Sequence, residues 1–150
     1  MSKTQKMITL TQSVRGAFNR LKLMSDALHA DTAITTAMRA VMESLQAEGT
    51  QTVPQIARSK GVTRQHIQLL ADSLCSEGLA AFQDNPAHKR SQLLALTDRG
   101  RKAFSKMAAR EVPLIEELAS TFDAKDIETA ISVLQRLSEF VDARMPDSDS

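Results

Sequence analysis

The order of short elements between Thr52 and Gly100 constrains this chain more than any other feature of its sequence. Thr52 and Gln55 flank Val53-Pro54 as a helix start requires, because a hydroxyl can cap free backbone amides and a glutamine three residues later can reach back to the cap. Proline is tolerated in the first turn of a helix. Gly61 can take the left-handed conformation that ends a helix. The pattern predicts a short helix followed at once by a tight turn.

A second helix is predicted directly after this turn, with Thr63 as its N-terminal cap. Its apolar residues recur at intervals of three and four, at Ile67, Leu70, Ala71 and Leu74. This stripe leaves Arg64, Gln65 and Gln68 on other faces, where they can meet a partner. Two helices joined by so short a turn are typical of a helix-turn-helix.

A hairpin with a basic tip is predicted after Gly78. Two short, partly alternating segments, 79–84 and 91–96, are joined by a loop that begins with turn-forming residues and carries Lys89-Arg90 at its tip. Thr97 is then placed to cap a further helix. Helix, turn, helix and hairpin in this order predict a winged helix-turn-helix, in a fold class that is mainly α with a small β-hairpin.

Taken as a set, these motifs resemble the transcriptional regulators of the MarR (multiple antibiotic resistance regulator) family. The resemblance is carried by Val53-Pro54-Gln55-Ile56-Ala57, Thr63-Arg64-Gln65-His66-Ile67, Leu74, Glu77-Gly78-Leu79, Arg90 and Leu96-Thr97-Asp98-Arg99-Gly100. It covers the central third of the chain closely, and the flanking helices fit in length and pattern. The resemblance implies a homodimeric repressor that binds palindromic double-stranded DNA, with a small apolar or aromatic molecule as the candidate effector that releases it.

Donor and acceptor chemistry suggests how the second helix contacts DNA. Gln65 and Gln68 can each offer a donor and an acceptor to adenine, and Arg64 can reach guanine or a phosphate. The Thr63 hydroxyl can bind a backbone oxygen, and His66 is expected near the DNA backbone or at the end of its own helix. The alternative is that these polar residues are ordinary solvent-exposed side chains.

The hairpin, or wing, is expected to add affinity and a preference for DNA shape. By the resemblance, Arg90 holds the position of the arginine that enters the minor groove, and Lys89 lies beside it, so a narrow A·T-rich groove would attract both. His88 stands where many relatives have an aspartate that braces this arginine, so the wing is expected to be either less rigid or braced by another residue. His88 itself either contacts phosphate when protonated or is a bystander. Leu69 replaces a basic residue of many relatives, which predicts the loss of one phosphate contact.

The net charge of +1 conceals an uneven distribution along the chain. Residues 51–104 carry eight lysines and arginines against four acidic residues, whereas residues 105–150 carry five against ten. Positive charge therefore lies on the predicted winged helix-turn-helix and negative charge on the C-terminal helices, which favours DNA at the centre of the chain. The low total leaves one alternative open, a winged helix that binds protein and has lost sequence-specific DNA binding.

Amphipathic helices are predicted on both sides of this region. The N-terminal helix has Val14, Phe18, Leu21, Met24 and Leu28 on one face, and the last helix has Ile127, Ala130, Ile131, Leu134, Leu137, Phe140 and Val141 on another. Asp123 is expected to cap the last helix, and Pro113 is expected to kink or break the helix before it. Such wide apolar faces must be buried, and we expect a second copy of the chain to cover them.

These observations predict a single domain over residues 1–150. The winged helix-turn-helix occupies residues 35–104 and is called the head below. Dimerisation helices are expected at 1–34 and 105–145, followed by a polar tail at 146–150. Recognition helices about 34 to 36 Å apart in such a dimer would fit successive major grooves of a palindromic site.

The residues offer no arrangement suited to an enzyme, a cofactor or a metal ion. No nucleophile with its base, carboxylate pair or phosphate-binding glycine loop can be assembled. The three histidines lack repeated ligand spacing, and Cys75 is the single cysteine. Cys75 has no adjacent basic residue to lower its pKa, so a plain thiol is expected rather than a redox switch.

The chain is expected to be cytoplasmic and to have no membrane partner. No apolar run approaches the roughly 18 residues that span a bilayer, and the first residues lack the apolar core of a signal peptide.

Overall fold

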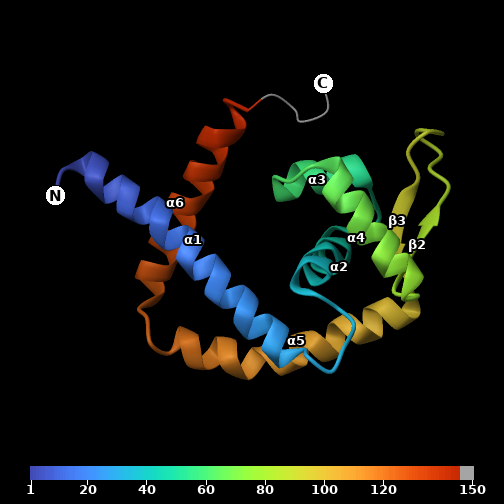
Figure 1. The fold of residues 1–150 in the computed structure, drawn as a ribbon, viewed down its shortest axis with the longest axis horizontal. Helices are drawn as coiled ribbons and strands as arrows, with labels where there is room; N and C mark the ends of the chain where they lie inside the picture. The colour runs from blue at the N-terminus through green and yellow to red at the C-terminus, as the bar shows by residue number, and fades with distance from the viewer. Residues whose placement is uncertain (146–150) are drawn as a thin grey trace. The chain divides into compact units, whose positions relative to one another are not determined.

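The computed structural model describes residues 1–145, and the predicted polar tail at 146–150 lies outside the described residues. The elements follow in the order α1 (Lys3–Leu28), α2 (Thr36–Glu48), β1 (Gln51–Thr52), α3 (Val53–Lys60), α4 (Arg64–Ser76), β2 (Ala80–Gln83), β3 (Leu93–Leu96), α5 (Asp98–Ala119) and α6 (Ala124–Asp142). They divide into two compact units, the first ending at Thr36 and the second beginning at Ala37. The fold is mainly α with a small antiparallel sheet, which confirms the predicted class (Figure 1).

The first unit consists of α1 and the turn that follows it. Ser2 caps α1 because its hydroxyl oxygen accepts the Gln5 amide at 3.1 Å, while the Gln5 side chain accepts the Ser2 amide at 2.8 Å. After the helix, the Thr36 hydroxyl donates to the Asp26 carboxylate at 2.5 Å. No residue of α1 is buried, so the helix adds nothing to a hydrophobic core in the single chain.

The second unit contains the hydrophobic core, which lies among α2, α3, α4 and the sheet. Its largest fully buried side chains are Val41, Met42, Ile56, Ile67, Leu74 and Leu94. The predicted caps of the helix-turn-helix are present: Thr52 and Gln55 form a capping box on α3, Gly61 ends that helix with φ of 68°, and Thr63 caps α4. The helix-turn-helix is therefore confirmed.

A third strand joins the predicted hairpin. β2 pairs with β3, with Phe82 opposite Leu94, and β3 pairs in turn with β1, giving the order β1-β3-β2. β1 consists of Gln51 and Thr52, a segment too short for any periodicity to reveal it. Because Thr52 is also the cap of α3, this strand ties the start of the helix-turn-helix to the base of the wing.

A close backbone approach fixes the start of α5 beside the residue that precedes β2. The Thr97 hydroxyl donates to the Gly78 carbonyl at 2.6 Å and accepts the Gly100 amide at 3.0 Å, so it clamps one segment while capping the other. A Cβ added at Gly100 would lie 1.9 Å from the Leu79 carbonyl oxygen. Only glycine permits this approach, which gives the Thr97 to Gly100 motif a structural reason.

Two predictions about the C-terminal helices need correction. The sequence predicted a kink or a break at Pro113. α5 continues through this residue to Ala119, so the break does not occur and a kink stays a prediction. An interior proline costs about 3 kcal/mol, because its nitrogen cannot donate to the carbonyl one turn earlier. The 22-residue helix is nevertheless continuous. Asp123 precedes α6 as predicted but makes no side-chain cap; its backbone carbonyl instead accepts the amides of Asp126 and Ile127 at 3.1 and 3.2 Å.

An ion pair joins α2 to α5 within the second unit. Arg39 donates through Nε to Glu111 at 2.5 Å and contacts the second oxygen of the same carboxylate, a bidentate arrangement. The Arg39 guanidinium also lies 5.4 Å from the ring centroid of Phe104. These contacts attach the middle of α5 to the core of the head.

Candidate DNA interface

The first turn of α4, the recognition helix, presents its polar side chains to solvent. Thr63, Arg64, Gln65 and His66 are all exposed. The Thr63 hydroxyl oxygen accepts the His66 amide at 3.1 Å, so the hydroxyl hydrogen can still be donated to a phosphate oxygen. Because the N-terminus of a helix carries partial positive charge, the cap places this hydroxyl where an anion is favoured.

Gln68 is exposed on the same helix, but part of its amide is already engaged. Its Nε2 donates to Asp72 Oδ1 at 2.9 Å, one turn further along α4. The bond leaves Oε1 and one amide hydrogen for another partner. A base contact by Gln68 therefore stays a prediction, with one donor already used within the helix.

The loop of the wing is braced by Asn85. Its Nδ2 donates to the Ser91 carbonyl at 3.0 Å across the loop, and its Oδ1 accepts the Ala87 amide at 3.1 Å. The second bond is an asparagine turn, which fixes the backbone two residues further on. Asn85 therefore fixes the backbone of the loop, and neither of these two bonds involves Arg90. The sequence signal was Asn85 before a proline, read only as a turn former.

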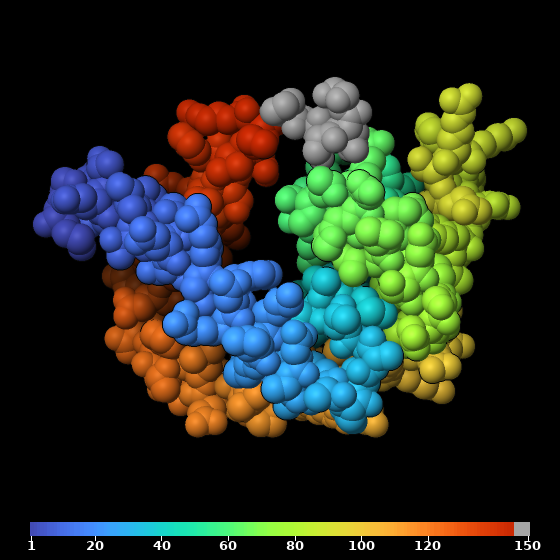
Figure 2. Space-filling view, in the orientation of Figure 1, coloured from blue at the N-terminus to red at the C-terminus, as the bar shows by residue number. Residues whose placement is uncertain are grey.

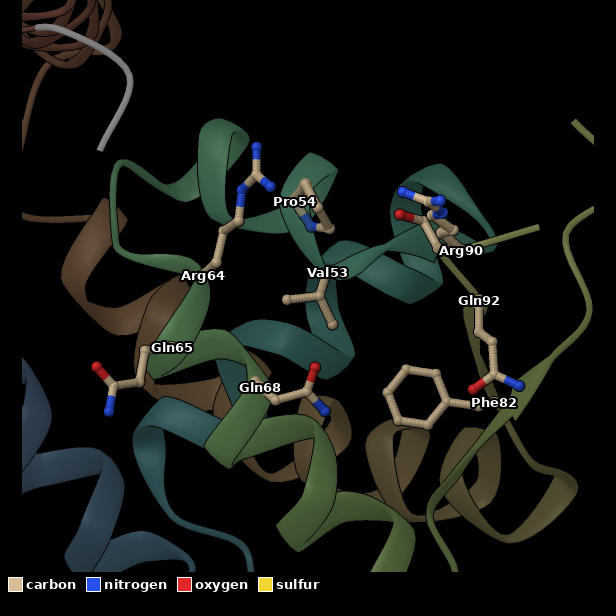
Figure 3. A pocket seen from close by; sticks show the side chains of 9 residues that line it. Val53, Pro54, Arg64, Gln65, Gln68, Phe82, Arg90 and Gln92 are labelled. Carbon is tan, nitrogen blue, oxygen red and sulfur yellow. The ribbon is translucent and has the colours of Figure 1, made fainter. Parts of the chain in front are cut away.

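Arg64 and Arg90 border one depression between the recognition helix and the wing, although they lie far apart in the sequence. The depression has a volume of about 380 Å³ and is lined by Val53, Pro54, Arg64, Gln65, Gln68, Phe82, Arg90, Ser91 and Gln92. The Gln68 amide is directed toward the Phe82 ring, whereas the Gln65 amide points away from that ring (Figure 3). Fixed positive charge and flat apolar surface are thus combined at one place.

The predicted wing residues are exposed, but only one of them reaches this depression. Arg90 belongs to its lining, while His88 and Lys89 lie on the loop outside it. The wing projects from the rest of the second unit (Figure 2). Sequence reasoning missed Phe82 and Gln92, because alternation in a short strand indicates which face a residue takes and not what it borders.

Cys75 lies at the C-terminal end of α4 and is half-buried. Burial raises the pKa of its thiol, the nearby Asp72 carboxylate raises it further, and a hydrogen bond with the Phe82 backbone acts in the opposite direction. The net shift is upward, so the reactive thiolate is disfavoured. Within residues 1–145, no three histidine, cysteine or acidic side chains are grouped as they would be around a metal ion. No helix in that range is both long and apolar enough to cross a bilayer.

No family model matches the chain. An uncharacterized protein of Mycobacterium tuberculosis and its counterpart in Mycobacterium bovis are each 37% identical to it over 95 residues. The match covers 63% of this chain and 66% of each mycobacterial protein. The chain therefore matches slightly less than two thirds of the length of these relatives.

Solved structures share the fold over nearly the whole chain. A MarR family transcription regulator has a TM-score of 0.77 at 22% identity, covering 94% of this chain and 93% of its own. A cysteine-to-serine mutant of MarR from Escherichia coli, complexed with operator DNA, has a TM-score of 0.77 at 20% identity and covers 91% and 99%. BpsR from Bordetella bronchiseptica has 0.74 at 18%, covering 85% and 91%. The chain therefore has the winged helix fold of the MarR family of transcription regulators.

Proposed function

We propose that this chain is a sequence-specific regulator of transcription that binds double-stranded DNA as a homodimer. The observation that carries the proposal is that Arg64 of the recognition helix and Arg90 of the wing border one exposed depression. Two fixed cations on adjoining elements suit the phosphate backbone of a nucleic acid. The E. coli MarR mutant, which has the same fold, was solved with operator DNA, and this supports the same use of the surface here.

In the proposed complex, α4 enters the major groove and the wing follows the neighbouring minor groove. Gln65 and Gln68 read adenine, and Arg64 binds guanine or a phosphate. Lys89 and Arg90 enter the narrow minor groove of an A·T-rich flank. The remaining predicted residues, Thr63, His66 and His88, contact phosphates and set the register of the head on the duplex.

The proposed homodimer is supported by surface that the single chain leaves uncovered. Neither α1 nor α6 has a buried residue, and on α6 the side chains of Ile131 and Leu134 are 50% and 42% exposed. A second copy would cover these faces about a twofold axis and set two recognition helices on one side of the DNA. We therefore propose a palindromic or nearly palindromic operator, at which the bound dimer blocks transcription as a repressor.

We further propose that a small apolar or aromatic effector releases the dimer from DNA. BpsR, a protein of the same fold, has its DNA binding regulated by 6-hydroxynicotinic acid, which supports this class of ligand. Such a molecule must bind a dimer with unsuitable head spacing better than the DNA-binding form. A differential of about 1 to 3 kcal/mol is typical of such coupling.

Single substitutions of the two arginines test the proposal. We expect Arg64→Ala and Arg90→Ala each to weaken binding to operator DNA and to lower the slope of log affinity against log salt by about one. Arg136→Ala removes the same charge from an exposed position of α6 and serves as the matched control. Fluorescence anisotropy over a range of salt concentrations measures both quantities. Equal affinity and slope in all four proteins would contradict the proposal and favour a winged helix that binds protein.

A further inference from the structure

We propose that Leu69 recognises the 5-methyl group of a thymine in the major groove; this inference rests on the proposed binding of DNA by α4. Leu69 lies in the middle of the recognition helix with 61% of its surface exposed. The other two leucines of the helix differ from it, since Leu74 is fully buried in the core and Leu70 is half-buried. Leu69 is thus an apolar side chain placed among the polar ones that face outward from α4.

Helix geometry places Leu69 in the same row as Gln65. Residues four apart are neighbours on one face, and Leu69 follows Gln65 by about 6 Å along the axis and about 40° around it. An advance of this size corresponds to about two base-pair steps of B-DNA. A helix that presents Gln65 to the edge of one base pair therefore presents Leu69 to a base pair about two steps away.

Gln68 does not continue this row. Its amide donates to Asp72 at 2.9 Å and is directed toward Phe82 in the depression beside the wing, so one of its donors is already used within the helix (Figure 3). The outward row of α4 therefore runs from Gln65 to Leu69. The Ser73 hydroxyl, which comes next, donates to the Leu69 carbonyl at 3.0 Å and is satisfied within the helix.

The chemistry of the major groove leaves one base group for a leucine to contact. The base edges there present hydrogen-bond donors and acceptors together with the thymine methyl, and only the methyl gains from an apolar neighbour. Facing any other base edge, Leu69 would desolvate polar atoms without replacing their hydrogen bonds. Leu69 thus discriminates between thymine and the other bases. Its role is more than the loss of a phosphate-binding cation at this position.

Deoxyuridine tests this directly, because it removes the methyl group and keeps the pairing edge of thymine. Duplexes bound by the full-length protein are first selected from a random pool. Each thymine of one half-site is then replaced by deoxyuridine, first alone and then together with its symmetry mate. Binding is measured by anisotropy for the unchanged protein, Leu69→Ala and Leu69→Met. Duplexes with deoxyuridine outside the half-sites are the controls.

At one symmetric pair of thymines, replacement by deoxyuridine should weaken DNA binding by the unchanged protein and by Leu69→Met. Removing one methyl should weaken binding about threefold to fourfold, and removing both about tenfold, as expected for the burial of one methyl group in each half-site. Leu69→Ala should bind the duplexes with thymine and with deoxyuridine at this position equally well. The sensitive position should lie about two base pairs from the one that Gln65→Ala relaxes.

Three results would overturn the inference while leaving DNA binding intact: half-sites without thymine near that position, no thymine whose methyl matters, or an equal loss with Leu69→Ala. If the unchanged protein selects no duplex at all, the proposed function itself fails. The two failures are therefore distinguishable in one series of measurements.

Discussion

The head and the helices α1 and α6 differ in whether the chain itself buries their apolar surface. Every buried apolar residue of the described chain lies between Ile34 and Met107, whereas α1 and α6 contain none. Both regions have apolar stripes at helical spacing, yet only those of the head are covered within the chain. Amphipathic spacing shows that a face must be covered, and the fold shows whether the chain itself covers it. The uncovered faces are where a second copy is expected.

The largest expected effect comes from adding one methyl group to the head. A Cβ at Gly100 would lie 1.9 Å from the Leu79 carbonyl oxygen and 2.9 Å from its carbon, and a backbone pair cannot move aside as a flexible side chain can. We expect Gly100→Ala to lower the free energy of unfolding by about 3 kcal/mol or more, at the upper end for overpacked sites. Urea denaturation followed by circular dichroism measures this change.

Gly16→Ala makes the same substitution in α1 and is the matched control. A Cβ there meets only the Arg20 guanidinium, at 3.0 Å, the far end of a flexible side chain. Since alanine is favoured over glycine in a helix by about 1 kcal/mol, the variant should be as stable as the unchanged protein or slightly more stable. Similar losses in both variants would contradict the contrast between the two regions.

The second effect concerns association and not folding. Leu134→Asp places a charge on the exposed apolar face of α6, where the proposed interface would desolvate it. We expect the dimer dissociation constant to rise about 100-fold or more, with the circular dichroism of the head unchanged. Sedimentation equilibrium measures the constant. Ser132→Asp, an exposed position on the opposite side of α6, should leave it nearly unchanged. An equally stable dimer in both variants would remove α6 from the interface.

The smallest expected effect on stability comes from the wing. Asn85→Ala removes the bonds to the Ser91 carbonyl and the Ala87 amide, which together contribute about 1 to 2 kcal/mol at most. The hydrogen exchange of the Ala87 amide should accelerate, and DNA affinity should fall several-fold because Arg90 is held less firmly. Asn85→Asp keeps the acceptor for Ala87 and should be intermediate. If exchange and affinity stay unchanged in Asn85→Ala, the wing is braced elsewhere.

The parts of the fold that could be predicted from sequence depend on local rules. Thr52, Thr63 and Thr97 all cap helices as predicted, because capping needs only a hydroxyl next to free amides. The predicted break at Pro113 was wrong, because a proline removes only its own backbone donor and a helix can continue past it. The strand β1 was missed because two residues have no period.

The sequence predicts which residues of the candidate interface are exposed, but not how they are arranged. Arg64 and Arg90 belong to separate sequence motifs, and the packing of α4 against β2 brings them to one depression. The bond from Gln68 to Asp72 and the brace by Asn85 depend on side-chain rotamers, which spacing does not specify. Periodicity likewise indicates that an apolar helix face is covered, but not whether the same chain or a second chain covers it.

We propose that the head binds specific DNA sequences and that the uncovered helices α1 and α6 join two copies of the chain. Selection of bound duplexes from a random pool, followed by footprinting of the selected site, tests both parts at once. We expect a twofold-symmetric footprint with half-site centres about 10 base pairs apart, one turn of B-DNA. Failure to retain any duplex, or protection of a single half-site without symmetry, would contradict it.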